Sequence, residues 1–176
     1  MDYIHSLRAL TGSRKLILNC AGVLIERDGK LLLQRRSDNG LWGFVGGLLE
    51  LDETYAEAAV REALEETGCA VRLTAFLGIF HNRDMQWANG DRAHTIGAYY
   101  TAELVSGTPR VDEESLELRF FAREEMPPLF APDHRAALAA YESGLRLPLP
   151  ESGPAETAEE PACPQGGEQE ADCDRG

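Results

Sequence analysis

One helical segment, with glutamates on one side and small apolar residues on the other, limits the folds open to this chain more than any other stretch. Asp52 is a suitable N-cap and Gly68 a suitable terminator, so we predict a helix over residues 53–67. The apolar stripe of this helix can be buried against a sheet, and its small side chains permit close packing. At about 100° per residue, the stripe consists of Ala56, Val60, Ala63, Leu64 and Thr67.

The three glutamates Glu62, Glu65 and Glu66 fall within about 100° of one another and are expected to point away from the sheet. Like charges at helical spacing cost roughly 0.2 to 0.5 kcal/mol per pair, and a hard cation such as Mg²⁺ or Mn²⁺ would offset this cost. An ordinary solvated acidic face is the alternative, and it is more frequent for three glutamates alone. Glu53 projects to nearly the opposite side of the helix, so we expect it to be structural and not a metal ligand.

Further segments have the composition and turn signals of β-strands and predict a mixed sheet. The first two are separated by Asp28 and Gly29, a strong hairpin signal. Residues 37–47 are rich in glycine, asparagine and aspartate and are expected to form a loop. The predicted strands are residues 16–26, 30–35, 70–80, 93–104 and 116–122, and further helices are predicted at residues 1–10 and 133–142.

The size and charge of the chain fit one folded domain with an acidic extension. The 176 residues, of which 43% are hydrophobic, suffice for one core, and we place this domain at residues 1–148. Residues 149–176 are expected to form a disordered tail, since from Glu151 onward there are eight acidic residues, one arginine and almost no large apolar side chains. The expected role of the tail is solubilisation, with binding of a partner as the alternative.

Composition also argues against several classes of protein. No stretch of about 18 apolar residues exists and no basic region followed by an apolar stretch begins the chain, so we expect no membrane association, no secretory signal and a cytoplasmic location. A net charge of -13 disfavours binding to the backbone of nucleic acid. The cysteines lack the spacing of zinc ligands and are expected to be free thiols, namely Cys20, Cys69, Cys163 and Cys173.

The stretch over residues 47–69, GLLELDETYAEAAVREALEETGC, resembles the signature of the Nudix hydrolase family, the Nudix box. The resemblance extends over residues 16–141, since the strand ending in LLLQRR and the segment NGLWGFVGG look like the family's approach to its catalytic helix. Val45 stands where family members often have proline and Asp52 where they often have glycine, which leaves loop geometry and substrate preference open. The fixed positions of the box are filled by Gly47, Glu53, Arg61, Glu62, Glu65, Glu66 and Gly68.

The resemblance implies an α/β Nudix fold, a single domain in which a mixed sheet lies between helices. It also implies a hydrolase in which water attacks one phosphorus of a diphosphate while Mg²⁺ or Mn²⁺ neutralises charge on the phosphoryl oxygens. The implied catalytic and metal-binding residues are Glu62, Glu65 and Glu66, and the backbone carbonyl of Gly46 would complete the metal shell.

Other residues of the box have structural roles in this interpretation. Arg61 is expected to pair with the acids around it and to hold the preceding loop to the helix, while Gly47 and Gly68 shape the backbone. The general base is left open, because family members differ in which glutamate removes the proton from water. The candidates are Glu62 and, in a later loop, Glu113, Glu114 and Glu117.

Candidates for substrate contacts lie outside the box. Arg35 and Arg36 alternate across a strand, so only one faces the cleft, where it can contact a phosphate. His81 and His94 are isolated in sequence and are expected to have ordinary polar roles. An aromatic wall could stack on a nucleobase, although most aromatic residues fill the core of a domain this size; the candidates are Trp42, Phe80, Tyr99 and Tyr100.

The implied substrate is a nucleoside diphosphate linked to another group, such as ADP-ribose, a nucleotide sugar, a dinucleoside polyphosphate or a nucleoside triphosphate. A non-hydrolytic nucleotide-binding or sensing module of the same fold is the alternative, and the complete set of glutamates argues against it. In a third interpretation the folded part is a platform for the acidic tail. The expected partners are a small nucleotide-like molecule and, on general grounds, a second copy of the chain in a homodimer.

Overall fold

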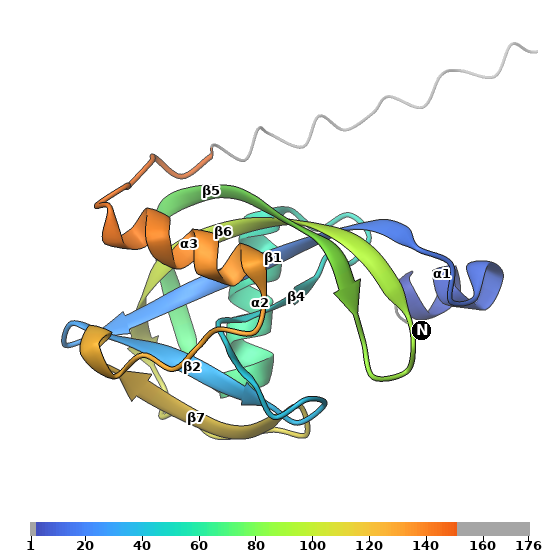
Figure 1. Cartoon of the computed structure of the whole chain (residues 1–176). Helices are drawn as coiled ribbons and strands as arrows, with labels where there is room; N and C mark the ends of the chain where they lie inside the picture. The colour runs from blue at the N-terminus through green and yellow to red at the C-terminus, as the bar shows by residue number, and fades with distance from the viewer. Residues whose placement is uncertain (1–2, 151–176) are drawn as a thin grey trace, which may run out of the picture.

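The computed structural model describes residues 3–150, which form a seven-stranded mixed sheet with helices on both faces (Figure 1). This confirms the predicted α/β class and the single domain. The predicted tail from residue 151 onward lies outside the described residues, as do Cys163 and Cys173, so the domain boundary at residue 148 stays a prediction. Among residues 3–150, none of the helices has the length and hydropathy of a membrane-spanning segment.

The sheet is built around β1 (Leu16–Arg27), which has different neighbours along its two edges. On one edge β6 (Arg92–Ser106) runs parallel to it, followed by the antiparallel β5 (Ala70–Gln86). The other edge is shared, because β4 (Val45–Leu48) pairs with residues 20–23 and β2 (Lys30–Arg36) pairs only beside the turn. Beyond the turn β2 pairs instead with β7 (Ser115–Phe121) and β3 (Trp42–Gly43). The strands β1 and β2 therefore diverge, and β4 takes the place beside β1.

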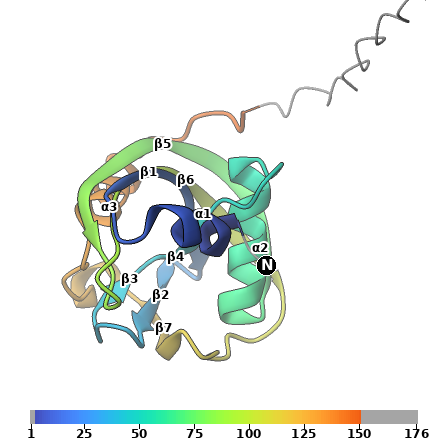
Figure 2. The ribbon, with the colours of Figure 1, turned by 90° about the vertical axis from the view of Figure 1, so that its right-hand side faces the viewer.

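Two helices cover opposite faces of the sheet. On β1 the alternate residues Val23 and Ile25 belong to the core under α2 (Tyr55–Thr67), whereas Leu24 belongs to the core under α3 (Pro132–Glu142). A third helix, α1 (Tyr3–Thr11), lies at one end of the molecule. When the molecule is viewed from that end, α1 is in the middle, with α3 to its left and α2 to its right (Figure 2). The strand alternation therefore produces two cores, with the sheet between them.

The end of α2 was predicted correctly, but its start was not. Gly68 adopts the left-handed conformation and terminates the helix. The N-cap is Thr54 and not Asp52, because the Thr54 hydroxyl accepts a hydrogen bond from the Glu57 backbone and the Glu57 carboxylate accepts one from the Thr54 backbone. Asp52 instead lies in the preceding turn with a φ of 63°. Glu53 therefore precedes the helix. The expectation that it lies opposite the three glutamates assumed a helical position, so it does not apply.

The buried face of α2 also differs from the predicted stripe. Val60 and Leu64 are 38% and 54% exposed, so they do not face the sheet. The buried residues are Ala58, Ala59, Ala63, Glu66 and Thr67. Three alanines allow the close approach, and the helix is turned so that Glu66 points inward with them. The prediction that all three glutamates face away from the sheet was therefore wrong.

Most of the remaining elements were predicted correctly. The Asp28–Gly29 turn joins β1 to β2, with both residues at positive φ as a tight hairpin requires. The strand and helix positions agree, although β5 extends to Gln86 and β6 begins at Arg92. The loop predicted at residues 37–47 contains β3 and the start of β4. These strands are short and glycine-rich, and their pairing with β2 and β1 is not visible in local sequence.

Candidate active site

A cavity of about 520 Å³ lies where β1, β4, α2 and the start of α3 meet. Its wall also includes side chains of α1 and of the hairpin between β5 and β6. Sites for small molecules have volumes of roughly 300 to 1,000 Å³, so the cavity is large enough for a nucleotide-sized ligand. Figure 2 shows α1 and this hairpin at the end of the molecule that faces the viewer.

Glu66 lies in the wall of the cavity and is only 4% exposed. Its Oε2 accepts a hydrogen bond from the Gly46 backbone at 2.9 Å, and its Oε1 accepts one from Gln34 Nε2 at 3.0 Å. Burial raises the pKa of Glu66 to about 8, although the two donors lower it. The negative charges of Glu62 and Glu114 raise it further. The site therefore holds a carboxylate whose charge needs a positive partner.

Glu62 lies one helical turn before Glu66 and faces the same cavity, with 14% of its side chain exposed. Burial raises its pKa, while the contact with Arg61 opposes the shift. Its carboxylate lies directly against Gly47, where a Cβ atom would come within 2.2 Å of Glu62 Oε1. A glycine in β4 thus leaves the space that the Glu62 carboxylate occupies.

Arg61 connects the loop before the helix to the glutamates. Its Nε and Nη2 donate to the two oxygens of Glu53 at 2.7 and 2.9 Å, and Nη2 also donates to the Leu48 carbonyl at 3.1 Å. Its Nη1 donates to Glu62 at 2.8 Å and to Glu65 at 2.9 Å. The ion pair with Arg61 lowers the pKa of Glu53. Glu53 therefore lies on the same side as the acid cluster, joined to it through one guanidinium group, and not opposite to it.

Glu65 differs from its two neighbours in exposure. Its side chain is 59% exposed and pairs with Arg61 at the surface of α2, and it does not line the cavity. Within residues 3–150, no three side chains of histidine, cysteine, aspartate or glutamate are grouped closely enough to hold a metal ion. The cavity presents a pair of carboxylates from Glu62 and Glu66, beside the backbone of Gly46.

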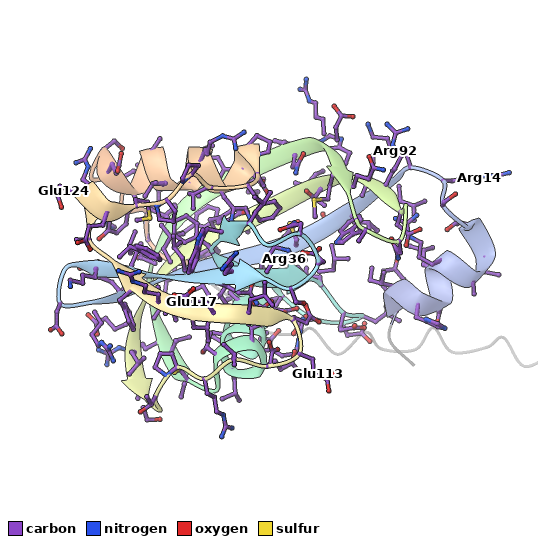
Figure 3. All side chains as sticks on the ribbon, turned by 60° about the horizontal axis from the view of Figure 1, so that its bottom comes forward. Arg14, Arg36, Arg92, Glu113, Glu117 and Glu124 are labelled. Carbon is purple, nitrogen blue, oxygen red and sulfur yellow. The ribbon has the colours of Figure 1, made fainter. Side chains whose placement is uncertain are left out.

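Of the predicted arginines and late-loop glutamates, some line the cavity and others do not. Arg36 lines the cavity and pairs with Asp38 at 2.9 Å, whereas Arg35 donates to the Gly40 carbonyl away from it. Glu114 also lines the cavity. The remaining acids, Glu113 and Glu117, do not line the cavity, and in Figure 3 they lie along β7 and the loop before it, while Arg36 lies nearer the centre of the molecule.

The predicted aromatic wall is mostly core. Trp42 packs edge-on against Phe121 with the ring centroids 4.9 Å apart, and Phe80 packs edge-on against Tyr99 with the ring centroids 5.8 Å apart. Tyr99 and Tyr100 alternate on β6, so Tyr100 joins the core under α2 and only Tyr99 lines the cavity. Trp42, Phe80 and Tyr100 do not line it. The aromatic side chains that join Tyr99 in the wall are His5, Trp87, Phe130 and His134.

Several polar residues of the site were not predicted from sequence. Gln34 is 1% exposed and donates to Glu66 and to Ser115 Oγ, and its place at the end of an apolar strand was the available signal. Asp133 and His134 come from the first turn of α3, where no motif marks them. Burial lowers the pKa of His134 to about 4, and its Nδ1 accepts a hydrogen bond from the Phe44 backbone.

Two residues that are isolated in sequence are neighbours in the structure. The Nδ1 atom of His81 and the Nε2 atom of His94 are 3.1 Å apart across β5 and β6. Neither side chain lines the cavity. The described cysteines, Cys20 and Cys69, are free thiols as predicted. Cys20 lines the cavity, where burial raises its pKa to about 12, so it is a neutral part of the wall.

Comparisons with known proteins agree with this geometry. Residues 16–141 match the NUDIX domain. The chain is 32% identical to an ADP-ribose pyrophosphatase of Methanocaldococcus jannaschii over 142 residues, which cover 79% of this chain and 75% of the relative. It is 33% identical to the phosphatase NudJ of Escherichia coli over 135 residues, which cover 72% and 84% of the two chains.

Among solved structures, a MutT NUDIX hydrolase from Burkholderia pseudomallei resembles the fold with a TM-score of 0.62. Its sequence is 32% identical, and the match covers 70% of this chain and 97% of that one. The region that matches the NUDIX domain, residues 16–141, contains the whole sheet and the glutamate helix α2. The chain therefore belongs to the Nudix family and is a Nudix-type pyrophosphohydrolase.

Proposed function

We propose that this protein is a metal-dependent hydrolase that cleaves the diphosphate linkage of a nucleoside diphosphate joined to another group. The observation that carries the proposal is the burial of Glu66 beside Glu62 in the wall of a cavity of nucleotide size. Two carboxylates at one wall attract a cation, and the cation in turn attracts a diphosphate.

The residues fit Mg²⁺ or Mn²⁺, which prefer oxygen ligands. Each oxygen of Glu66 accepts one hydrogen bond and keeps a further acceptor position. Gly47 leaves room for the Glu62 carboxylate. We propose Glu62 and Glu66 as the principal ligands, the Gly46 carbonyl as a backbone ligand, and Glu65 as a further ligand once it leaves Arg61. When bound, the cation neutralises charge on the phosphoryl oxygens and on the leaving phosphate.

The side chains of the cavity divide the remaining work. Arg36 supplies a fixed positive charge that can bind a phosphate. A glutamate takes a proton from the attacking water. The water oxygen bonds to phosphorus, and the bridging P–O bond breaks so that its electron pair stays with the leaving phosphate. Among the late-loop candidates, Glu114 is favoured over Glu113 and Glu117 because it alone of the three lines the cavity. Glu62 is the other candidate for this base.

The relatives bear on the substrate. One is named an ADP-ribose pyrophosphatase and another, from Bacillus subtilis and 27% identical, a putative 8-oxo-dGTP diphosphatase. Both names describe nucleotides with a diphosphate linkage. A nucleotide-type substrate is therefore supported, and we favour a diphosphate joined to a second group because the relative that covers more of this chain acts on one.

The test is a screen for product release over a panel of nucleotides, with Mg²⁺, with Mn²⁺ and with chelator. We expect turnover of at least one diphosphate substrate with metal and none with chelator. Glu66→Gln should reduce kcat by more than about 100-fold with the fold intact, since changes around a metal site already cost about 10- to 100-fold. The matched control is Glu103→Gln, because Glu103 pairs with Arg72 on the surface of β6 and is outside the cavity.

Near-normal activity of Glu66→Gln at saturating Mg²⁺ would contradict the assignment of the ligands. Nucleotide binding without turnover of any member of the panel would instead support the non-hydrolytic sensing module. Circular dichroism of each variant separates a loss of chemistry from a loss of folding.

A further inference from the structure

Asp133 is a buried acid of the cavity that the reaction proposed above does not use. It lies in the first turn of α3, is 4% exposed and lines the cavity. Its Oδ2 accepts a hydrogen bond from the Tyr99 hydroxyl at 2.9 Å. Its Oδ1 is buried and accepts no hydrogen bond from any residue between 3 and 150. One acceptor atom of this carboxylate therefore has no protein partner in the described part of the chain.

Such an arrangement is costly, because a buried acceptor without a partner loses its hydration and receives nothing in return. None of the ion pairs among the described residues involves Asp133. Its position at the start of α3 favours the negative charge through the helix dipole, but that interaction does not satisfy Oδ1.

The sheet is shaped to hold the partner of Asp133. The ring of Tyr99 lies over Gly22 of β1 and Gly97 of its own strand. A Cβ atom at Gly22 would come within 2.4 Å of the Tyr99 ring, and one at Gly97 within 2.9 Å. These two glycines leave the space that the Tyr99 ring occupies. The Tyr99 hydroxyl can therefore reach Oδ2 of Asp133 from the sheet, and this hydrogen bond orients the carboxylate.

The surroundings indicate what Oδ1 can accept. A phosphate would be repelled by the negative charge of Asp133, whereas an N–H donor would be attracted to it. The neighbouring rings suit a planar ligand, since His134 lies 4.8 Å from Phe130 and 5.6 Å from Tyr99, and all three line the cavity. Adenine, guanine and cytosine are planar rings that carry amino N–H groups, so they fit this description.

We propose that Asp133 determines specificity by accepting a hydrogen bond at Oδ1 from the exocyclic amino group of the substrate's nucleobase. Tyr99 is the positioning residue that holds the carboxylate through Oδ2. This inference rests on the proposed function for the identity of the ligand as a nucleotide, and it assigns the base to the α3 side of the cavity. The diphosphate then belongs on the side of Glu62 and Glu66.

The experiment measures binding of nucleosides to the full chain in the presence of chelator, so that neither phosphate nor turnover contributes. Adenosine, guanosine and cytidine are compared with analogues that lack one amino group, namely purine riboside, inosine and pyrimidin-2-one riboside. The wild-type chain should bind at least one natural nucleoside about tenfold or more tightly than its analogue. In Asp133→Leu, which keeps the volume but has no acceptor, this ratio should fall to near one.

Two further variants sharpen the result. Asp133→Asn keeps one oxygen and should retain part of the ratio. Asp84→Leu, on an exposed acid of β5 whose side chain is 79% exposed, is the matched control and should keep the wild-type ratio. An unchanged ratio in Asp133→Leu would overturn the proposal and leave Oδ1 to a water molecule. If that variant does not fold, the wild-type chain decides, and equal binding of natural nucleosides and analogues overturns the proposal.

Failure of the proposed reaction would be seen separately. If the nucleotide panel gives no turnover but nucleoside binding still depends on Asp133, the hydrolase proposal fails and the specificity role stands. If turnover is metal-dependent but binding is independent of Asp133, the reverse holds.

Discussion

At the scale of single residues, a polar side chain outside the Nudix box supports the carboxylate of Glu66. Gln34 Nε2 donates to Glu66 Oε1, and this hydrogen bond lowers the pKa of Glu66 against the effect of burial. In Gln34→Met, which has a similar length but no donor, the pKa of Glu66 should rise above its present value of about 8. The carboxylate that we propose as a metal ligand would then form only at higher pH.

We therefore expect Gln34→Met to weaken the apparent affinity for Mn²⁺ by about 10- to 100-fold and to move the pH–rate profile upward. Mn²⁺ titration of activity across pH measures both effects. Ser115→Ala is the control, because it removes the other partner of Gln34 and leaves the hydrogen bond to Glu66. Equal Mn²⁺ affinity of wild type and Gln34→Met would show that the Glu66 carboxylate is oriented without this amide.

A second residue, His134, links stability to pH. Burial lowers the pKa of His134 to about 4 and is the largest effect. The negative charge of Asp133 raises this pKa, and the positive charges of Arg36 and Arg135 lower it. Between this value and the unfolded value of about 6.5 the unfolded chain binds a proton that the folded chain does not. Stability from neutral His134 is therefore present above about pH 6.5 and is lost as the pH falls toward 4, by roughly 3 kcal/mol at most.

Urea unfolding across this pH range tests the expectation. In His134→Gln the amide oxygen can accept the hydrogen bond from the Phe44 backbone but does not titrate. The difference in unfolding free energy between the two proteins should therefore change with pH in this window and be constant above it. Parallel pH curves for wild type and variant would mean that His134 is protonated without cost.

At the scale of elements, the adjacent glycines Gly46 and Gly47 of β4 make room for different atoms. Gly46 lies against the backbone of β1, and Gly47 lies against the side chain of Glu62. Gly46 has a φ of 151°, and a Cβ atom there would come within 2.2 Å of the Ala21 carbonyl oxygen of β1. At Gly47 the nearest atoms belong to the end of the Glu62 side chain. Backbone cannot yield to a Cβ atom, whereas a carboxylate can turn away.

Gly46→Ala should therefore destabilise the domain, by about 1 to 3 kcal/mol, because the strand pairing of β4 with β1 must shift. Gly47→Ala should keep nearly wild-type stability but lose activity, because the Glu62 carboxylate is displaced. Urea unfolding and kcat, measured on both variants, separate the two effects. Full activity of Gly47→Ala would show that the position of Glu62 in this structure is not the one required for turnover.

The elements also show why sequence predicted only part of the fold and the site. The long strands and the end of α2 were predictable because local patterns specify them, as at Gly68. The start of α2 was missed although a local pattern specifies it too, because Thr54 and Glu57 form a capping box that the choice of Asp52 as N-cap overlooked. β4 was missed because its partner β1 lies more than 20 residues earlier in the chain. Short glycine-rich strands carry no periodicity that would reveal such a pairing.

The same distinction applies to the active site. The box marked Glu62 and Glu66, because a family signature is a local pattern. It did not mark Gln34 or Asp133, which reach the cavity from β2 and α3 and meet the glutamates only through the sheet. The helical projection also failed for Glu66, because it assumed that charged side chains face water. A cavity beside the sheet allows an acid to face inward.

At the scale of the whole molecule, the cavity draws on segments from almost the full described length of the chain. Helix α1 precedes the region that matches the family domain, yet its residue Arg8 lines the cavity. Arg8 also donates to the Arg92 carbonyl at 3.0 Å and pairs with Asp91 at 3.3 Å, which ties α1 to the hairpin between β5 and β6. The part of the cavity wall that α1 contributes therefore lies outside the region that matches the family domain, whereas the hairpin that it contacts lies inside that region.

The burial of Glu66 links the proposed metal binding to the stability of the entire domain. Its pKa in the folded chain, about 8, lies above the ordinary value of 4.5. Without a cation, the stability contributed by the protonated acid is present below about pH 4.5 and is lost as the pH rises toward 8, because only the unfolded chain ionises freely. A cation reverses this trend because it binds the ionised carboxylate of the folded chain and not the unfolded one.

Mg²⁺ or Mn²⁺ should therefore raise the Tm, and the increase should be larger at pH 8 than at pH 6. A free cation concentration of 100 times the Kd contributes about 2.7 kcal/mol, which for a domain of this size corresponds to roughly 5 to 10 °C. Glu66→Gln should raise the Tm of the cation-free protein at pH 8 and abolish the response to cation, while Glu103→Gln should behave as wild type in both respects. Thermal unfolding at the two pH values, with cation and with chelator, measures all of these quantities. A Tm increase that is equal in wild type and Glu66→Gln would place the cation somewhere other than this carboxylate pair.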